Sequence, residues 1–237
     1  RKARVLPYQL MAAYMAASKD VPQIVREALQ DAMEIAIANV PEIKGRVVVC
    51  PDVSGSMSSP VTGAHKGATS AVRCIDVAAL VAAAMLRVNR EARVLPFEQS
   101  VVDVVLNPRD SVMTNAARLA AIGGGGTSCS APLAQLDKEK AAVDLVVFIS
   151  DNESWVDSGR SGATAMMSEW SAIKARNPAA KLVCIDIQPY GTTQAAARED
   201  ILNVGGFSDA VFEIVAQFAA GELGPAHWVG EIEKIEV

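Results

Sequence analysis

The chain has 237 residues, of which 51% are hydrophobic, enough to bury a substantial core in one large α/β domain. Its formal net charge of -5 argues against a surface that holds nucleic-acid backbones through bulk positive charge. We find neither an apolar run long enough to span a membrane nor the apolar core of a signal peptide, and therefore expect a cytoplasmic protein without membrane association.

Residues 1–44 predict a helical extension in front of the main fold. The stretch Tyr8–Ala17 is rich in Ala and Met. Pro22 can occupy the first turn of a second helix, which apolar residues at helical spacing extend to Asn39. We therefore expect a pair of helices before the main domain begins.

From residue 45 to residue 221 the pattern changes to apolar strands that alternate with helices. The expected strands are Val47–Cys50, Val94–Phe97, Val101–Leu106, Leu145–Ile149 and Leu182–Ile187. The expected helices are Ala71–Asn89, Thr114–Ile122, Ala131–Lys140, Ala163–Arg176 and Ser208–Ala220. Apolar strands joined by helices predict a doubly wound, mostly parallel sheet with helices on both faces.

Two segments predict departures from a purely parallel sheet. Only Glu98–Ser100 separates the second and third strands, which is too short for a parallel crossover. We therefore expect these two strands to form an antiparallel hairpin at one edge. Residues 222–237 form a tail whose final alternating sequence, VGEIEKIEV, could add a further edge strand.

The four cysteines, Cys50, Cys74, Cys129 and Cys184, lie far apart and inside or beside apolar segments. This spacing fits neither a zinc site nor a disulfide framework. It predicts buried, reduced thiols.

Polar residues follow the predicted strands at their carboxyl ends, where doubly wound sheets bind their ligands. The sequence DVSGSM places Asp52, Ser54 and Ser56 behind the first strand, and Asp151 follows the strand DLVVFIS. Thr127 lies in the loop GGGGTSCS, whose glycines let the backbone approach another group closely. Two carboxylates and three hydroxyls make an all-oxygen set, which suits a hard divalent cation: Mg²⁺ first, with Mn²⁺ or Ca²⁺ as alternatives.

Two other interpretations of this motif are open. Asp, Ser and Gly after a strand also form ordinary turns. A phosphotransfer enzyme with Asp52 as its nucleophile is the catalytic alternative. Such sites usually need a second Asp two positions later, where this chain has Ser54, and the sequence contains no Walker-type phosphate loop. We therefore expect no enzymatic activity.

Four blocks in order, DVSGSMSSPVTG, GGGGTSCSAPL, ISDNESW and ILNVGGFSDAVFEIVAQF, resemble the von Willebrand factor A domain of Ro ribonucleoproteins, the TROVE-module family. The resemblance implies a metal-ion-dependent adhesion site. Its first loop would be Asp52, Ser54 and Ser56, its second Thr127 and its third Asp151. Many von Willebrand factor A domains carry an Asp directly after the Thr; this chain has Ser128, which predicts weaker cation binding.

The resemblance also implies partners. In the family, a ring of paired helices binds noncoding Y RNAs and misfolded RNA in RNA quality control, and residues 1–44 resemble the end of that ring. RNA would then bind through the ring of the parent protein, and we expect neither DNA nor a membrane as a partner. The alternative is a metal-dependent protein-interaction module, unrelated to RNA, in which a partner's carboxylate completes the coordination of the cation.

Overall fold

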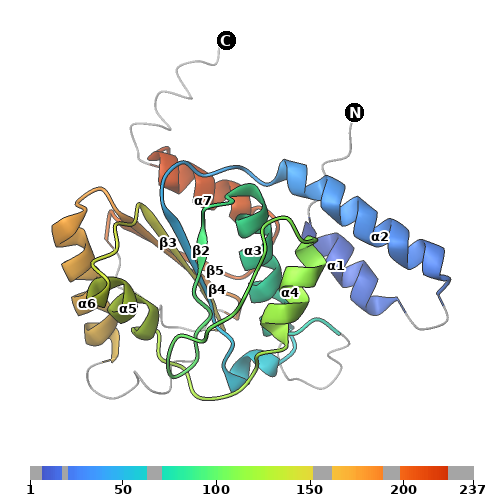
Figure 1. Ribbon diagram of the computed structural model, residues 1–237, viewed down its shortest axis with the longest axis horizontal. Coiled ribbons are helices and arrows are strands. Elements are labelled where there is room, and N and C mark those ends of the chain that lie inside the picture. The colour runs from blue at the N-terminus through green and yellow to red at the C-terminus, as the bar shows by residue number, and fades with distance from the viewer. Residues whose placement is uncertain (1–6, 18–20, 63–70, 152–161, 189–197, 224–237) are drawn as a thin grey trace, which may run out of the picture.

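The computed structural model describes residues 7–17, 21–62, 71–151, 162–188 and 198–223. Its centre is a five-stranded sheet in the order β2-β1-β3-β4-β5, in which every pair of neighbouring strands is parallel (Figure 1). The strands are β1 (Val47–Pro51), β2 (Arg93–Val94), β3 (Leu145–Ser150), β4 (Lys181–Asp186) and β5 (Ile201–Gly205). The chain leaves β1 for β2 on one side and returns to β3 on the other, so the strand order reverses between β1 and β3.

The two central strands explain why the sheet forms. Every residue of β1 and of β3 is buried, and both strands are rich in valine. Valine favours strands because its branched side chain packs well on a pleated surface, and strands that are apolar throughout require helices on both faces. Successive side chains point to opposite faces, so Val47 and Val49 join one hydrophobic cluster while Val48 and Cys50 join the other.

Helices cover both faces of the sheet, as predicted. The helices α5 and α6 lie on one face, and α3, α4 and α7 lie on the other together with α1 and α2 (Figure 1). The α-helices are α1 (Pro7–Ala16), α2 (Gln23–Ala36), α3 (Cys74–Val88), α4 (Val112–Ala120), α5 (Ala131–Lys138), α6 (Gly162–Arg176) and α7 (Val211–Ala220), and the 3-10 turns are η1 (Ile37–Asn39) and η2 (Gly55–Ser58). In the described part of the chain, each helix is too short or too polar to cross a membrane.

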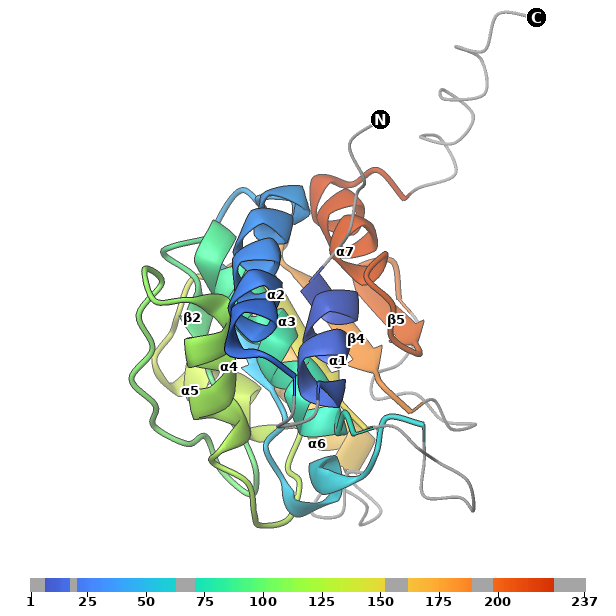
Figure 2. The same ribbon diagram turned by 90° about the vertical axis from the view of Figure 1, so that its right-hand side faces the viewer.

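The two N-terminal helices share a core with the sheet domain. Met11 of α1 and Met33 of α2 are buried in the same hydrophobic cluster as β1 and α3. Asp209, which precedes α7, accepts a 3.0 Å hydrogen bond from the backbone N–H of Tyr8. The rings of Tyr8 and Phe207 pack edge to face, with their centroids 5.1 Å apart. Helix α1 therefore lies against α3 and near α7 (Figure 2).

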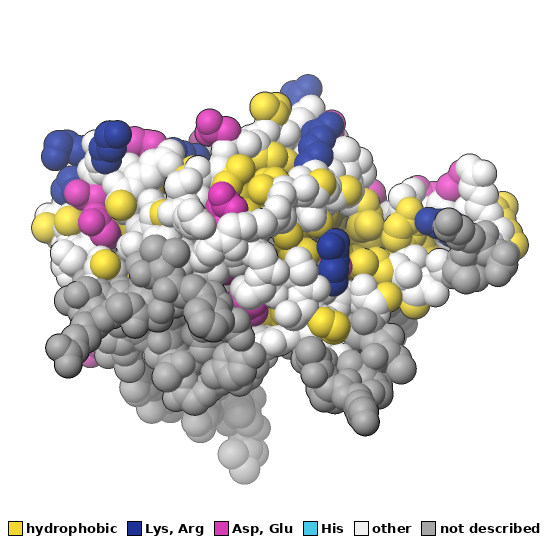
Figure 3. Space-filling view, turned by 90° about the horizontal axis from the view of Figure 1, so that it is seen from below, with side chains coloured by type: hydrophobic (Ala, Val, Ile, Leu, Met, Phe, Trp, Pro, Cys, Tyr) yellow, Lys and Arg dark blue, Asp and Glu magenta, His cyan; other side chains and the backbone are white. Residues whose placement is uncertain are grey.

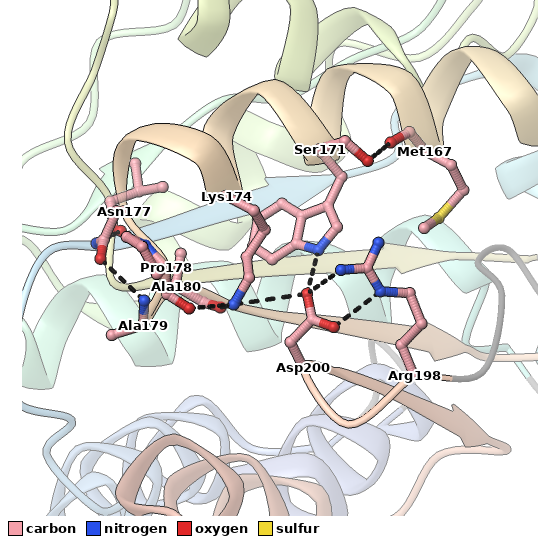
Figure 4. Close-up of polar contacts among 11 residues, drawn as sticks. Met167, Ser171, Lys174, Asn177, Pro178, Ala179, Ala180, Arg198 and Asp200 are labelled. Atoms are coloured by element: carbon pink, nitrogen blue, oxygen red, sulfur yellow. Dashed lines mark hydrogen bonds and ion pairs between the residues drawn. The ribbon is translucent and has the colours of Figure 1, made fainter.

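A buried tryptophan ties α6 to the chain that enters β5. Trp170 is fully buried, and its indole N–H donates a 2.8 Å hydrogen bond to Asp200. Asp200 also accepts from the guanidinium of Arg198 and lies 3.7 Å from the Lys174 ammonium group (Figure 4). These contacts stabilise the partly buried carboxylate of Asp200, because burying a charged group without partners costs free energy.

The prediction of an antiparallel hairpin at the edge was wrong. Strand β2 is only two residues long and parallel to β1, and the residues from Val101 to Leu106 form no strand; a single antiparallel bridge joins Phe97 to Val101. The amides of Leu95 and Phe97 donate toward β1, which leaves position 96 to donate outward. Residue 96 is a proline without an N–H group, so the outer ladder cannot continue.

Strand β5 was not predicted, because its sequence, ILNVG, mixes apolar residues with Asn and Gly and is only partly buried. Most of the tail, residues 224–237, lies outside the described residues, so its suggested edge strand stays a prediction. All four cysteines are buried and none forms a disulfide, which confirms the prediction of buried, reduced thiols.

Candidate functional site

Because β1 and β3 are parallel, their carboxyl ends lie at the same edge of the sheet, and an acidic residue follows each of them. Asp52 follows β1 and remains hydrogen bonded to the sheet, because its amide donates to the Ile149 carbonyl at 2.9 Å. Asp151 follows β3 directly and is 2% exposed. Both residues lie where the strand order reverses, the usual binding crevice of a doubly wound sheet.

The Asp52 carboxylate is held by hydrogen bonds on both oxygens. Oδ1 accepts from the Ser54 amide at 2.8 Å, and Oδ2 accepts from the Ser150 hydroxyl at 2.7 Å. Sequence reasoning missed Ser150. Its only signal was a small polar residue at the end of an otherwise apolar buried strand.

Three hydroxyl groups gather beside this carboxylate. The Thr127 hydroxyl donates to Ser54 Oγ at 2.8 Å, and the oxygens of Ser54 and Ser56 are 3.3 Å apart. Ser54 and Thr127 are fully buried, while Ser56 is partly exposed. The structure thus brings the three predicted hydroxyl residues to one place, and Ser56 is the more exposed of them.

The glycine loop makes this meeting of loops possible. The Gly55 amide donates to the Gly125 carbonyl at 3.1 Å, and the Gly124 amide donates to the Val53 carbonyl at 3.2 Å. Gly124 and Gly125 have φ angles of 141° and 69°, which residues with a side chain rarely adopt. The loop therefore needs glycine at these positions to bring Thr127 to Ser54.

Burial and a neighbouring charge both act on the Asp52 carboxyl. Burial raises the pKa of Asp52 to about 6; hydrogen bonds from Ser54 and Ser150 oppose this shift, and the charge of Asp151 adds to it. The negative charge of Asp151 thus disfavours the ionised form of the Asp52 carboxyl. A bound cation would remove this penalty, because it would be the largest local charge in the site.

The oxygen spacings fit a small octahedral cation. Ligands at about 2.1 Å from Mg²⁺ lie about 3.0 Å from each other along an octahedral edge. The spacings of 2.8 Å and 3.3 Å among the three hydroxyls bracket this length. Among the described residues, no group of three or more His, Cys, Asp and Glu side chains could hold a metal ion. A cation here would therefore depend on the hydroxyl oxygens as well as the carboxylates.

The sequence of this sheet domain matches the model of one protein family, the Ro60 vWA domain, over residues 46–219. The chain belongs to the Ro60 vWA domain family. The match begins just before β1 and ends inside α7, so it includes every residue of the site described above.

Curated relatives of this Ro60 vWA domain carry the name RNA-binding protein RO60. The protein from Deinococcus radiodurans is 28% identical over 204 residues, which cover 86% of this chain and 37% of the relative. The protein from Caenorhabditis elegans is 24% identical over 239 residues, which cover 94% of this chain and 35% of the relative. The chain thus spans little more than a third of these relatives.

A solved structure supports the fold. The crystal structure of the Deinococcus radiodurans RO (RSR) protein aligns with a TM-score of 0.71 at 23% identity, over 93% of this chain and 45% of that chain. The aligned share of this chain exceeds the region matched by the family model, so the likeness in fold extends beyond the vWA domain itself.

Proposed function

We propose that this vWA domain binds a divalent cation, Mg²⁺ in the first place, at the carboxyl edge of its sheet. The carrying observation is the hydroxyl cluster of Ser54, Ser56 and Thr127 beside the buried Asp52. These residues and Asp151 would hold the ion, and the ion would offer an open coordination position to an oxygen ligand.

The test is a calorimetric titration of the chain with Mg²⁺ and with Mn²⁺. We expect binding by the wild-type chain and its loss in Asp52→Ala and in the isosteric Asp52→Asn, because each removes a charged oxygen ligand. Circular dichroism should show that Asp52→Asn keeps the fold. Equal binding by wild-type chain and folded Asp52→Asn would refute the assignment.

We further propose that the parent of this domain is a Ro-like RNA-binding protein that acts on noncoding Y RNAs and misfolded RNA in RNA quality control. The names of the relatives support RNA binding. On the face seen in Figure 3, the visible Lys and Arg side chains are scattered and do not form one patch. This distribution and the net charge of -5 favour an RNA interface in the remainder of the parent.

A filter-binding assay tests where RNA binds. We expect this chain alone to bind single-stranded RNA with a dissociation constant weaker than about 1 μM, the range of non-specific contacts. Tighter, saturable binding by the chain alone would place an RNA site within it and contradict the proposal.

We propose a binding role without catalysis. Asp52 is fully buried, and Ser54 stands two positions later, where phosphotransfer sites of this kind usually carry a second Asp. Release of phosphate from an aryl phosphate, abolished in Asp52→Asn, would contradict this. Four cysteines without a disulfide suit a reducing compartment, and we propose the cytoplasm.

A further inference from the structure

A third acidic residue, Glu98, follows β2 at the carboxyl edge of the sheet. Phe97 pairs with Asp52 in parallel register, and the Phe97 carbonyl accepts a 2.9 Å hydrogen bond from the Val53 amide. Glu98 is the next residue along the chain. It therefore lies at the same edge of the sheet as Asp52, one strand away.

The backbone of Glu98 supports the loop that carries Thr127. The Glu98 carbonyl accepts a 2.8 Å hydrogen bond from the amide of Ser128, the neighbour of Thr127. The Glu98 amide donates to the Ser100 carbonyl at 3.0 Å and closes a tight turn. These two bonds fix the position of Glu98 relative to the second loop of the site.

The side chain of Glu98 lies against Gly125. A methyl group on Gly125 would be only 2.1 Å from Glu98 Oε2 and 2.7 Å from its Cδ. The Gly125 carbonyl accepts from Gly55, which stands between Ser54 and Ser56. The Glu98 carboxylate thus lies against Gly125, whose hydrogen bond to Gly55 connects the second loop of the site to the first.

The charge of Glu98 is not neutralised by any neighbour in the described part of the chain. There its carboxylate forms neither an ion pair nor a hydrogen bond. Its charge lies at the same edge of the sheet as the charges of Asp52 and Asp151, and a cation bound at that edge would be attracted by all three carboxylates.

We propose that Glu98 is an outer carboxylate of the cation site, a positioning residue that strengthens cation binding without coordinating the ion. The inference rests on the proposed function. Glu98 would act in two ways: its charge makes the potential at the site more negative, and its contact with Gly125 keeps the second loop against the first. Residues outside the coordination shell commonly tune metal affinity in this way.

The test is a calorimetric titration with Mn²⁺ of the wild-type chain and of Glu98→Gln, which keeps the size of the side chain and removes its charge. We expect binding about threefold to tenfold weaker in Glu98→Gln. The difference should shrink between about 50 mM and about 500 mM salt, because mobile ions screen charges that do not touch. A purely structural effect would not depend on salt in this way.

A matched control removes an equal charge far from the site. Glu91 is exposed and precedes β2, so it lies at the amino end of that strand, whereas the site lies at the carboxyl ends of the strands. Glu91→Gln should therefore bind Mn²⁺ like the wild-type chain. A second variant, Glu98→Ala, should bind no more tightly than Glu98→Gln. Circular dichroism of each variant checks the fold.

The outcomes separate this inference from the proposed function. If Asp52→Asn loses binding while Glu98→Gln binds like the wild-type chain, the inference on Glu98 is wrong and the metal site stands. A weakening that is independent of salt, or equal in Glu91→Gln, also overturns it. If the wild-type chain does not bind Mn²⁺ or Mg²⁺ at all, the proposed function itself fails.

Discussion

The Thr127 hydroxyl donates a 2.8 Å hydrogen bond to the Ser54 hydroxyl across 73 residues of sequence. Both side chains are fully buried, and the bond gives each hydroxyl a partner inside the protein in place of water. This bond connects the loop after β1 to the glycine loop, and it marks the point at which the candidate cation ligands meet.

Replacing Thr127 with valine should weaken Mg²⁺ binding by at least about tenfold, because the variant keeps the shape of the side chain and removes a ligand oxygen. Isothermal titration calorimetry measures the change. The control is Ser171→Ala, which removes an exposed hydroxyl on α6 that donates only to the Met167 carbonyl. Unchanged affinity in a folded Thr127→Val chain would exclude Thr127 from the coordination shell.

A cation that binds only the folded chain should stabilise it. At a free Mg²⁺ concentration about 100 times the dissociation constant, the expected gain is about 2.7 kcal/mol. For a domain of this size that gain corresponds to a rise in Tm of roughly 5 to 10 °C, measurable by calorimetric scanning. The rise should disappear with a chelator and in Asp52→Asn; an equal rise in that variant would point to binding elsewhere.

Helix α1 should unfold together with the sheet domain, because Met11 lies in their common core. We expect Met11→Ala to lower the free energy of unfolding by about 2–4 kcal/mol in a single cooperative transition. The control is Ile35→Ala on α2, where the side chain is 75% exposed and the change should stay within about 0.5 kcal/mol. Urea unfolding followed by circular dichroism distinguishes them, and a negligible effect of Met11→Ala would show that α1 is energetically separate.

Stability should depend on pH through Asp144, which precedes β3. The Arg46 guanidinium donates to both oxygens of Asp144, at 2.8 Å and 2.9 Å, and holds the pKa of that carboxyl well below its usual range. The stabilisation is therefore complete above the unfolded pKa of about 4 and is lost as the pH falls through the lower folded value.

The matching variant is Asp144→Asn. Because the pair is partly exposed, we expect a loss of only about 1 kcal/mol at pH 7. Urea unfolding at several pH values should show the difference from wild type narrowing as the pH drops below about 4. A difference that stays constant down to pH 3, or grows there, would contradict the role assigned to this ion pair.

Much of the fold could be predicted from the sequence, because buried strands and helices have characteristic patterns of apolar residues. Unbroken valine-rich runs predicted β1 and β3, and helical spacing predicted the helices within a few residues of their ends. The same patterns failed at the edges. Strand β5 is only partly buried, and Pro96 stops a hairpin that the apolar run after it had suggested.

By itself, the sequence determined which residues could serve a cation. Asp52, Ser54, Ser56, Thr127 and Asp151 all follow strands or lie in a glycine loop, and their oxygen chemistry can be seen without coordinates. Their resemblance to a known motif assigned them to the first, second and third loops of the site. The sequence could not place them at distances that allow a common ligand.

Only the tertiary structure decided how these groups are held. Ser150 bonds to Asp52, and Glu98 rests on Gly125, because parallel strands bring their carboxyl ends to one edge whatever the length of chain between them. Such contacts leave no periodic trace in the sequence, since each joins single residues from distant segments. The ligand types are a property of the chain, whereas the geometry that would bind an ion is a property of the packed sheet.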